Sequence, residues 1–379
     1  MTATICHLTD LPVENPWLNG VAVHHDRTRF RHIVVTLGQR NELHDALERR
    51  GVAAFALGSC FRREYPVGLA RLVLLLRREH VDILQTHMFE PSILGLLAGR
   101  IARVPIVLVT RHHSDFTTVF DKPVHRWLDR QQALRADLVL AASEAVRRSM
   151  IELEHVPPER IVVHRYGYEF DTLRPQLTEV SRAALRRDLG VQGGDPLLAV
   201  IARLSSDKGL PYLFEALPRL REEWPGLRVV LAGTGPLRAE LEALVASAGL
   251  AGVVTFLGWR SDAHRIMEAA DAVVHPTLHE AFCSVIIEAM ALERPLVTTD
   301  VAAAPEQVDT GETGILVPAR DPEALSRAIH RLLVDPEAAA AMGREARRRV
   351  VERFNFPKMM RLYEETYAQV AAPAWRRPE

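Results

Sequence analysis

With 379 residues, the chain exceeds the usual size of a single hydrophobic core, so we expect two domains. The 47 lysines and arginines nearly balance the 48 aspartates and glutamates, and a net charge of −1 disfavours a nucleic acid as the partner on bulk electrostatics. The three cysteines, Cys6, Cys60 and Cys283, lack the spacing of a metal or redox site, which indicates reduced thiols in the cytoplasm.

Neither a signal peptide nor a transmembrane segment is predicted. The first residues lack a basic start followed by an apolar stretch, and apolar runs such as residues 72–76 are far shorter than the ~20 residues that a membrane span needs. We therefore expect a cytoplasmic protein, while peripheral contact with a membrane surface stays open.

The first half of the chain alternates strand patterns with helical ones, which predicts a parallel, doubly wound sheet. Prolines and Asn19-Gly20 interrupt the chain before any long helix can form near the N-terminus. Ligands of such sheets bind beyond the C-terminal strand ends, where His87, His112 and His113 fall. The predicted strands cover residues 3–8, 30–37, 52–57, 83–85, 104–110, 138–140 and 160–164.

The second half repeats the alternation after a polar, arginine-rich connection at residues 171–195. This half therefore forms a second doubly wound domain, followed by three C-terminal helices at residues 322–333, 336–353 and 357–370. Its predicted strands cover residues 197–202, 228–232, 253–257, 272–275, 295–298 and 315–317.

Two glutamates spaced E-x7-E stand at the ends of an otherwise apolar segment in this half. Ser284 is a predicted helix N-cap, which places Glu280 in the strand-to-helix loop and Glu288 about one turn inside the helix. The helix start offers unpaired N–H groups to an anion, while carboxylates need hydroxyl or cationic partners. A phosphorylated sugar meets both needs. The alternative is a buried helix that carries two surface glutamates.

Three further loops follow predicted strands. Arg203 and Lys208 lie on one of them and suit a diphosphate, unless they are merely solvated. Gly233-Thr234-Gly235 lacks the third glycine of a dinucleotide fingerprint, so NAD binding is disfavoured, although a nucleotide backbone contact is still reasonable. Arg260 either borders a base or belongs to a plain loop. The histidines form no helical H-x3-H pair, so no metal site is predicted.

The order of these loop motifs resembles that of the nucleotide-sugar glycosyltransferases of family four. The motifs are strand-R-x4-K-G, G-x-G-x-L, strand-G-W, H-E-x-F and E-A-M-x3-R-P. The resemblance covers residues 30–368. It implies a GT-B fold, which is an α/β architecture of two facing Rossmann-like domains, and a retaining, metal-independent sugar transfer that needs no cofactor besides its co-substrate, a nucleotide-diphosphate sugar. The implied parts are an acceptor-side domain at 1–172, a nucleotide-sugar domain at 173–355 and a final helix at 356–379 that crosses back onto the first domain.

The resemblance also assigns roles to residues. Glu280 and His112 are implied as catalytic residues at the donor sugar, and Glu288 as the partner of the ribose hydroxyls. The remaining implied contacts are Arg203, Lys208 and the backbone of Cys283, Ser284 and Val285 at the donor phosphates, Gly233 and Arg260 at the nucleotide, and Gly20, His87 and His113 on the acceptor side.

The chain departs from the family pattern at two places. Ala281 and Cys283 stand where the family usually has glycines, and Asn19-Gly20 stands in place of an N-terminal glycine pair. Two other functions share the architecture: a sugar-nucleotide hydrolase or epimerase, and a non-catalytic nucleotide-binding protein. The residues do not specify the donor's base, its sugar or the acceptor.

Overall fold

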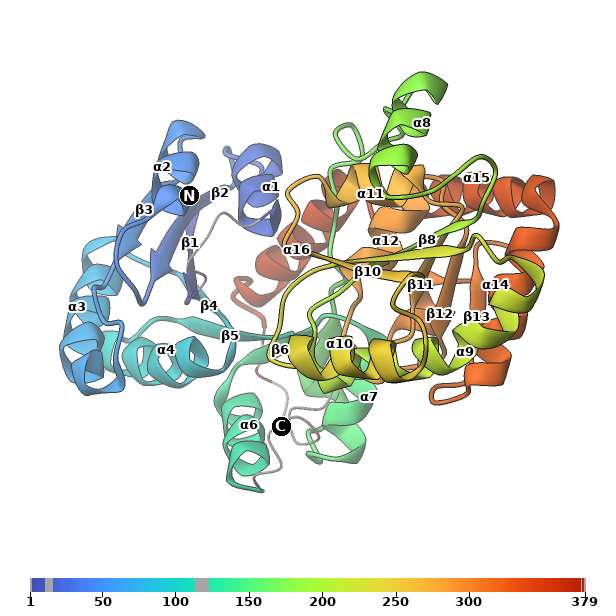
Figure 1. The fold of residues 1–379 in the computed structure, drawn as a ribbon. Coiled ribbons are helices and arrows are strands. Elements are labelled where there is room, and N and C mark those ends of the chain that lie inside the picture. The colour runs from blue at the N-terminus through green and yellow to red at the C-terminus, as the bar shows by residue number, and fades with distance from the viewer. Residues whose placement is uncertain (1, 11–15, 113–122, 376, 378–379) are drawn as a thin grey trace. The chain divides into compact units, whose positions relative to one another are not determined.

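The computed structural model describes residues 2–10, 16–112, 123–375 and 377. The chain forms two compact units: unit 1 comprises Met1–Glu169 and Phe354–Glu379, and unit 2 comprises Phe170–Arg353. Each unit contains one parallel sheet with helices on both faces (Figure 1), which confirms the predicted α/β class. The boundaries predicted at 172/173 and 355/356 lie a few residues from these.

Unit 1 is built on a seven-stranded sheet in the order β3-β2-β1-β4-β5-β6-β7. All neighbouring strands pair in parallel, and the strand order reverses direction on either side of β1, as in a doubly wound sheet. The strands are β1 (Ala3–Thr9), β2 (Phe30–Thr36), β3 (Ala53–Ala56), β4 (Ile83–His87), β5 (Ile106–Arg111), β6 (Leu138–Ala141) and β7 (Ile161–Val163).

Alternate residues of these strands face different helices, because side chains along a strand point to opposite faces. Cys6 and Leu8 pack into the cluster formed with α3 and α4, whereas Ile5 packs into the cluster formed with α1 and α16. The helices of unit 1 are α1 (Pro16–His24), α2 (Glu42–Arg49), α3 (Tyr65–Arg78), α4 (Phe89–Ala102), α6 (Pro123–Arg135), α7 (Glu144–Glu152) and α16 (Phe356–Val370).

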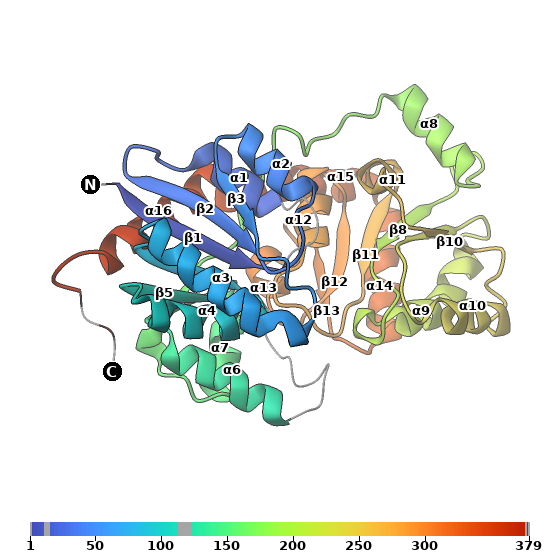
Figure 2. The ribbon, with the colours of Figure 1, turned by 90° about the vertical axis from the view of Figure 1, so that its left-hand side faces the viewer.

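Helix α16 comes from the end of the chain but belongs to the core of unit 1. Its residues Phe356, Tyr363 and Tyr367 are almost fully buried together with Ile5 of β1 and Ile83 of β4. Figure 2 shows this helix, in red, beside the blue strands of unit 1. Each large apolar side chain that is buried in this way contributes roughly 1.5–3 kcal/mol.

The sequence predicted that Asn19-Gly20 interrupts the chain before any long helix, but both residues lie inside the short helix α1. Gly20 lies inside α1 and is buried, and a Cβ atom there would come within 2.2 Å of the Phe356 ring. Glycine in a helix interior costs about 1 kcal/mol relative to alanine. Here its missing side chain lets α1 and α16 approach each other. Gly20 therefore has a packing role in this structure, while its acceptor-side role stays a prediction.

Unit 2 is built on a six-stranded parallel sheet in the order β10-β9-β8-β11-β12-β13. Helices α9 and α14 contribute to the apolar cluster on one of its faces, while α11 and α12 cover the other face (Figure 1). The strands are β8 (Leu197–Ile201), β9 (Arg228–Ala232), β10 (Val254–Gly258), β11 (Ala272–His275), β12 (Leu296–Thr299) and β13 (Ile315–Val317). The helices are α8 (Glu179–Asp188), α9 (Leu210–Glu223), α10 (Arg238–Ser247), α11 (Ala263–Ala269), α12 (Ser284–Ala291), α13 (Ala304–Gln307), α14 (Pro322–Val334) and α15 (Pro336–Arg353).

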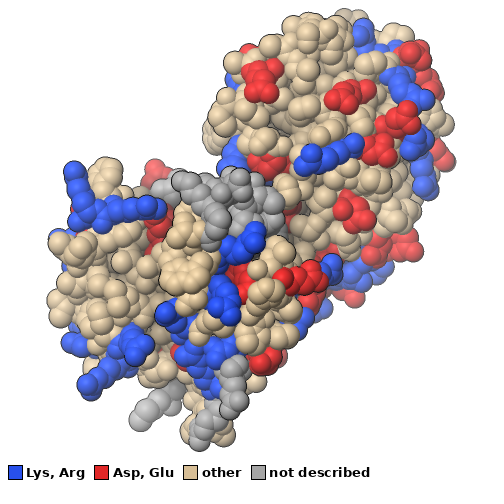
Figure 3. Space-filling model, turned by 90° about the horizontal axis from the view of Figure 1, so that it is seen from below, with Lys and Arg blue, Asp and Glu red and all other residues tan. Residues whose placement is uncertain are grey.

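The surface carries both signs of charge. On the face shown in Figure 3, basic side chains gather toward the left, and basic and acidic side chains mix elsewhere. Among the described residues, no helix combines the length and the apolar character that crossing a bilayer requires.

Candidate functional site

Two loops at the C-terminal edge of the unit 2 sheet are tied together. The loop after β8 contains Asp207, whose carbonyl accepts hydrogen bonds from the Leu278 N–H at 2.7 Å and the Thr277 hydroxyl at 3.0 Å in the loop after β11. Gly209 makes this approach possible. Its φ is +61°, and a Cβ atom there would lie 2.1 Å from the carbonyl oxygen of Pro276. The loops therefore hold their side chains at a fixed separation.

This connection brings Lys208 to Glu280. The Lys208 Nζ lies 2.5 Å from the Glu280 Oε2 and 3.4 Å from the Asp207 Oδ2. Burial disfavours the charged lysine, but Glu280 outweighs it and raises the pKa of Lys208. Burial also disfavours the carboxylate, but His275 and Lys208 outweigh it and lower the pKa of Glu280. Both groups are thus charged at neutral pH, and each compensates the burial of the other.

Arg203, the second predicted phosphate ligand, lies on the same loop but faces solvent. Its side chain is 65% exposed, and it lies 3.5 Å from the Asp207 carboxylate. The Arg203 Nε donates to the Ser205 hydroxyl at 3.2 Å, and that hydroxyl donates to Asp207 at 2.5 Å. Asp207, which the sequence did not single out, therefore contacts both predicted cations.

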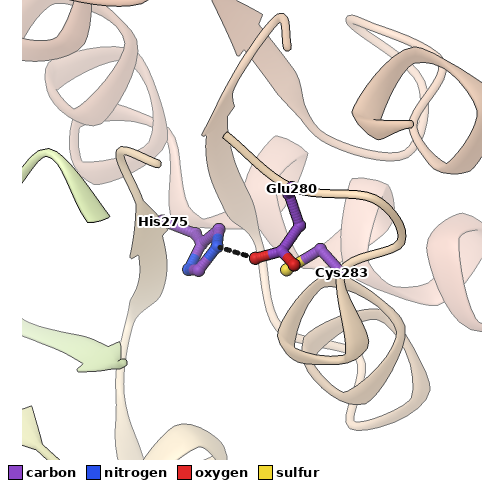
Figure 4. A group of neighbouring side chains, drawn as sticks. All are labelled: His275, Glu280 and Cys283. Atoms are coloured by element: carbon purple, nitrogen blue, oxygen red, sulfur yellow. Dashed lines mark ion pairs between the residues drawn. The ribbon is translucent and has the colours of Figure 1, made fainter. Parts of the chain in front are cut away.

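His275, Glu280 and Cys283 form a small cluster beside this ion pair (Figure 4). One ligand atom from each lies within 4.8 Å of the others. His275 is 2% exposed, its Nε2 lies 3.9 Å from Glu280, and neither ring nitrogen hydrogen-bonds to a described residue. Nitrogen, oxygen and sulfur are ligands that zinc accepts. However, the Lys208 ammonium already neutralises this carboxylate and would repel a divalent cation.

The start of α12 supplies the predicted anion-binding N–H groups, with one correction. The helix begins at Ser284, and Cys283 rather than Ser284 occupies the N-cap position. Within the described residues, no side chain caps this helix start. Gln307 instead holds the backbone of Cys283, since it accepts from the Cys283 N–H at 3.4 Å and donates to the Cys283 carbonyl at 2.9 Å. Ser284 and Val285 occupy the first turn, where N–H groups attract anions.

Glu288 lies on α12 and pairs with His264, the second residue of α11. The His264 Nε2 is 3.4 Å from the Glu288 Oε2, and this contact raises the pKa of His264. The sequence did not single out His264. Only its place, just after the strand-G-W loop, could have drawn attention to it. The Glu288 side chain is 22% exposed and is therefore partly accessible to a ligand.

The two predicted nucleotide-loop residues take different places. Gly233 has a φ of +148°, and a Cβ atom there would lie 1.9 Å from the carbonyl oxygen of Ala202. The Gly233 N–H donates to the Gly258 carbonyl at 2.7 Å, so this glycine packs the loops after β8, β9 and β10 together. Arg260 forms two 2.7 Å hydrogen bonds with Asp262 of its own loop.

The predicted site residues of unit 1 are brought together only in part. His87, at the end of β4, and His112, just after β5, share a hydrogen bond of 3.2 Å. Gly20 lies within α1, as described above. His113 lies outside the described residues.

The comparisons with known proteins agree with this architecture. Residues 20–171 match the family described as Glycosyltransferase Family 4, and residues 181–349 match Glycosyl transferases group 1. Alpha-D-kanosaminyltransferase from Streptomyces kanamyceticus is 34% identical over 262 residues, which are 66% of this chain and 67% of that protein. Alpha-maltose-1-phosphate synthase from Mycolicibacterium smegmatis is 29% identical over 316 residues, covering 78% of this chain and 80% of that protein.

Solved structures extend the likeness to nearly the whole chain. HepE from Anabaena, crystallised with UDP, has a TM-score of 0.81 at 23% identity and covers 97% of this chain and 100% of its own. Sucrose-phosphate synthase from Thermosynechococcus elongatus has a TM-score of 0.75 at 20% identity and covers 97% and 99%. These structures confirm the predicted GT-B fold class. The two family matches, together with the 34% identity to the kanosaminyltransferase, show that the chain belongs to the nucleotide-sugar glycosyltransferases of family four.

Proposed function

We propose that the chain transfers a sugar from a nucleotide-diphosphate sugar to an acceptor hydroxyl, with retention of the anomeric configuration and without a metal ion. One observation carries the proposal: the Lys208–Glu280 ion pair lies beside the uncapped start of α12 at one sheet edge. Cationic and N–H groups suit a diphosphate, and a carboxylate suits the hydroxyls of the attached sugar. Such edges are also where ligands of doubly wound sheets bind.

The proposed reaction exchanges one bond at the anomeric carbon. The bond from that carbon to the diphosphate oxygen breaks, and a bond to the acceptor oxygen forms on the same face of the sugar. The acceptor proton passes to the departing diphosphate, which therefore serves as the base. Lys208, Arg203 and the N–H groups of Ser284 and Val285 stabilise the negative charge that develops on the leaving group.

Lys208 and Glu280 change partners when the donor binds. In the free protein each neutralises the other, with side-chain exposures of 13% and 24%. A diphosphate that approaches Lys208 takes over part of this pairing, so Glu280 becomes available to the sugar hydroxyls. Positive charge develops on the anomeric carbon in the transition state, and a nearby carboxylate stabilises it. Glu288 holds the ribose hydroxyls beside His264, and Arg260 borders the base.

No metal ion is needed in this proposal, because the cations of the chain and the helix start supply the positive charge. Treatment with a chelator should leave transfer unchanged. Loss of activity that magnesium or manganese restores would refute metal independence.

His112 and His87 belong to unit 1, which we propose receives the acceptor. We place the reaction in the cytoplasm, in agreement with the three free cysteines.

The test begins with the nucleotide. UDP comes first in a thermal-shift panel with GDP and ADP, since solved structures of HepE contain UDP or UDP-glucose. A ligand at one hundred times its Kd stabilises the folded protein by about 2.7 kcal/mol. Lys208→Ala and Arg203→Ala should weaken nucleoside-diphosphate binding, by roughly 2–5 kcal/mol for the half-buried lysine and less for the exposed arginine. Arg219→Ala, at an exposed arginine of α9, is the matched control and should bind normally.

The products then separate the proposed function from its alternatives. NMR of the product formed from a nucleotide sugar and candidate acceptors should show the donor's anomeric configuration. If the donor is hydrolysed and no added acceptor receives its sugar, a hydrolase or epimerase is favoured. Nucleotide binding without any product would favour a non-catalytic protein, and inversion of configuration would refute retention.

A further inference from the structure

The outer surface of α3 and α4 in unit 1 exposes large apolar side chains. A helix that covers a sheet usually presents polar side chains to water. Here six large apolar side chains on these two helices, and on the loop before α3, are 38–66% exposed. They are Phe61, Val67, Leu74, Ile93, Leu97 and Ile101. A group of this kind marks a surface that binds something.

Five exposed arginines alternate with these apolar side chains along the chain. They are Arg63, Arg71, Arg77, Arg100 and Arg103. None of the five forms an ion pair with a residue that the structure describes, whereas their neighbours Arg62 and Arg78 pair with Glu90 and Glu79. The whole chain has a net charge of −1, so this positive charge is a local feature. The six apolar residues and the five arginines are termed the α3–α4 face below.

Helical spacing places both kinds of side chain on the outward side of each helix. On α3, Val67, Arg71 and Leu74 follow one another at steps of four and three residues, and on α4 a step of four joins Ile93 to Leu97. Residues at such steps lie on one side of a helix. The inward sides of both helices pack into one apolar cluster on the sheet.

The two helices form one continuous surface. They lie side by side over the same face of the sheet (Figure 2). At one end, the Arg77 guanidinium donates to the Ile101 carbonyl at 2.7 Å. At the other end, Arg62 pairs with Glu90 at 2.7 Å, and the Tyr65 hydroxyl donates to the same carboxylate. The two outward sides are therefore held in a fixed relation to each other.

The chemistry of this face selects among possible partners. A nucleic acid would supply phosphates for the arginines but nothing for Leu74 and Leu97. A second copy bound through the same face would place arginines against arginines, because such an interface is self-complementary. The surface of an anionic bilayer suits both kinds of side chain, since it offers charged headgroups and, just below them, acyl chains.

We propose that the α3–α4 face binds peripherally to the surface of a bilayer that contains anionic lipids. The arginines contact the lipid phosphates, and the apolar side chains enter the boundary between headgroups and acyl chains. Helix α6 contacts α4 and adds two exposed apolar side chains, Val124 and Trp127. Tryptophan is favoured at such boundaries. This binding does not depend on sugar transfer, so its test is separate from that of the proposed function.

Co-sedimentation with lipid vesicles tests the proposal in the full-length protein. Vesicles of phosphatidylcholine are compared with vesicles that also contain phosphatidylglycerol. We expect binding to the anionic vesicles to be at least about 10-fold tighter, because each arginine near an anionic surface contributes about 5-fold. Added salt should weaken this binding. Failure to bind the anionic vesicles, or equal binding to both, would overturn the proposal.

Two double variants locate the contact on the α3–α4 face. Arg100→Gln with Arg103→Gln removes two charges whose side chains form no hydrogen bond or ion pair within the described part of the chain, and should weaken binding roughly 10–30-fold. Leu74→Gln with Leu97→Gln removes the apolar contact and should weaken it roughly 10-fold. Because all four side chains are exposed, stability to urea should change little. Normal binding by both variants would refute this location.

Helix α8 of unit 2 supplies the matched control. Val180 is exposed there, and the exposed Arg187 forms no ion pair with a described residue. Val180→Gln with Arg187→Gln should therefore bind vesicles normally. A loss as large as that of the α3–α4 variants would show that any exposed arginine and apolar side chain suffice, and would overturn the proposal.

Cys60 allows a measurement without any substitution. It is exposed and adjoins Phe61, whereas Cys6 and Cys283 are buried. The emission of an environment-sensitive fluorophore on Cys60 should shift to shorter wavelength when anionic vesicles are added, because the probe enters less polar surroundings. An unchanged spectrum while the protein sediments with the vesicles would show that another surface makes the contact.

The alternative partners give distinct results. Light scattering that shows a dimer, which Leu74→Gln with Leu97→Gln dissociates, would assign the face to a second copy. Tight binding to DNA together with no binding to vesicles would assign it to a nucleic acid. Either result would overturn the bilayer proposal, whereas a monomer that binds anionic vesicles through this face would support it.

Discussion

At the scale of single residues, the two glutamates of the E-x7-E segment have different partners. Glu280 is paired with Lys208 in a loop, whereas Glu288 lies on α12 beside His264. Glu288→Gln should therefore weaken the binding of the free nucleoside diphosphate and of the whole donor alike. Glu280→Gln should lower kcat, because its carboxylate acts mainly in the transition state. Titration with the nucleotide and steady-state kinetics compare the two variants. Equal losses of nucleotide affinity at unchanged kcat would contradict this division.

The Lys208–Glu280 pair also predicts a dependence of stability on pH. The pKa of Glu280 is lowered in the folded protein, so its stabilisation is present above its unfolded pKa of about 4.5 and is lost as the pH falls through the folded value. The pKa of Lys208 is raised, so its stabilisation is complete below about 10.5 and is lost only as the pH rises through the folded value.

Glu280→Gln should therefore destabilise the protein most in the neutral range. We expect a loss of about 2 kcal/mol at pH 7, somewhat less than for a fully buried pair because both side chains retain some exposure. The difference from the unsubstituted protein should shrink as the pH falls below 4.5. Urea denaturation from pH 7 down to about pH 2 measures it. Glu323→Gln, at an exposed carboxylate, is the control and should change stability little at any pH.

At the scale of elements, the loop after β8 depends on one glycine. Gly209→Ala places an alanine in the left-handed backbone region, which costs free energy. It also adds a Cβ atom that would lie 2.1 Å from the Pro276 carbonyl oxygen, so one of the two loops must move. We expect a destabilisation of about 2–4 kcal/mol and weaker nucleotide binding, because Lys208 moves with the loop.

Gly249 provides the matched control for this loop. It also has a positive φ, of +66°, but no atom lies within 4 Å of a Cβ atom placed there. Gly249→Ala should therefore lose about 1 kcal/mol and bind the nucleotide normally. Equal effects of the two substitutions would show that backbone strain, rather than the contact between the loops, accounts for the result. Denaturation and calorimetric titration measure both.

The sequence predicted the strands and helices of this fold better than the contacts between them. Apolar runs identified the strands, because buried parallel strands have nearly continuous apolar patterns. Asn19-Gly20 was wrongly predicted to interrupt the chain, because the contact that requires a glycine inside α1 is made with Phe356, far away in the sequence. The N-cap at Cys283 was missed for a similar reason: Gln307 holds the backbone there.

The candidate site was predicted where the family pattern names its residues, and missed where contacts depend on strand order. Asp207 and His264 carry no pattern of their own and become visible only when neighbouring loops are brought together. Four histidines give a stronger case. The predicted strands contain His7 and His32 and place His87 and His112 at strand ends, but only the order β2-β1-β4-β5 makes the four rings neighbours.

At the scale of the whole molecule, unit 1 depends on a helix from the other end of the chain. The Tyr367 hydroxyl of α16 donates to the Gln85 Oε1, and the Gln85 Nε2 donates to Thr110 at 2.8 Å. Tyr367→Phe leaves a fully buried amide oxygen without this donor, which costs about 1–3 kcal/mol. We expect the unfolding transition of unit 1 to shift while that of unit 2 does not. Hydrogen exchange resolved by segment measures both.

The reverse control lies in unit 2. Leu217→Ala on α9 removes a fully buried side chain and should destabilise unit 2 by about 2–5 kcal/mol. If either substitution shifts the exchange of both units equally, the two units unfold together.

The return of α16 to unit 1 also determines when each unit can be completed during synthesis. Unit 2 is continuous along the chain, so all of its residues have been made once the ribosome passes Arg353. The N-terminal segment of unit 1 is made first, yet it must wait for Phe356–Val370 until all of unit 2 has been translated. At about 5–20 residues per second, this wait lasts roughly 10–40 s. During that time, the apolar face that α16 later covers is exposed to chaperones and to neighbouring nascent chains.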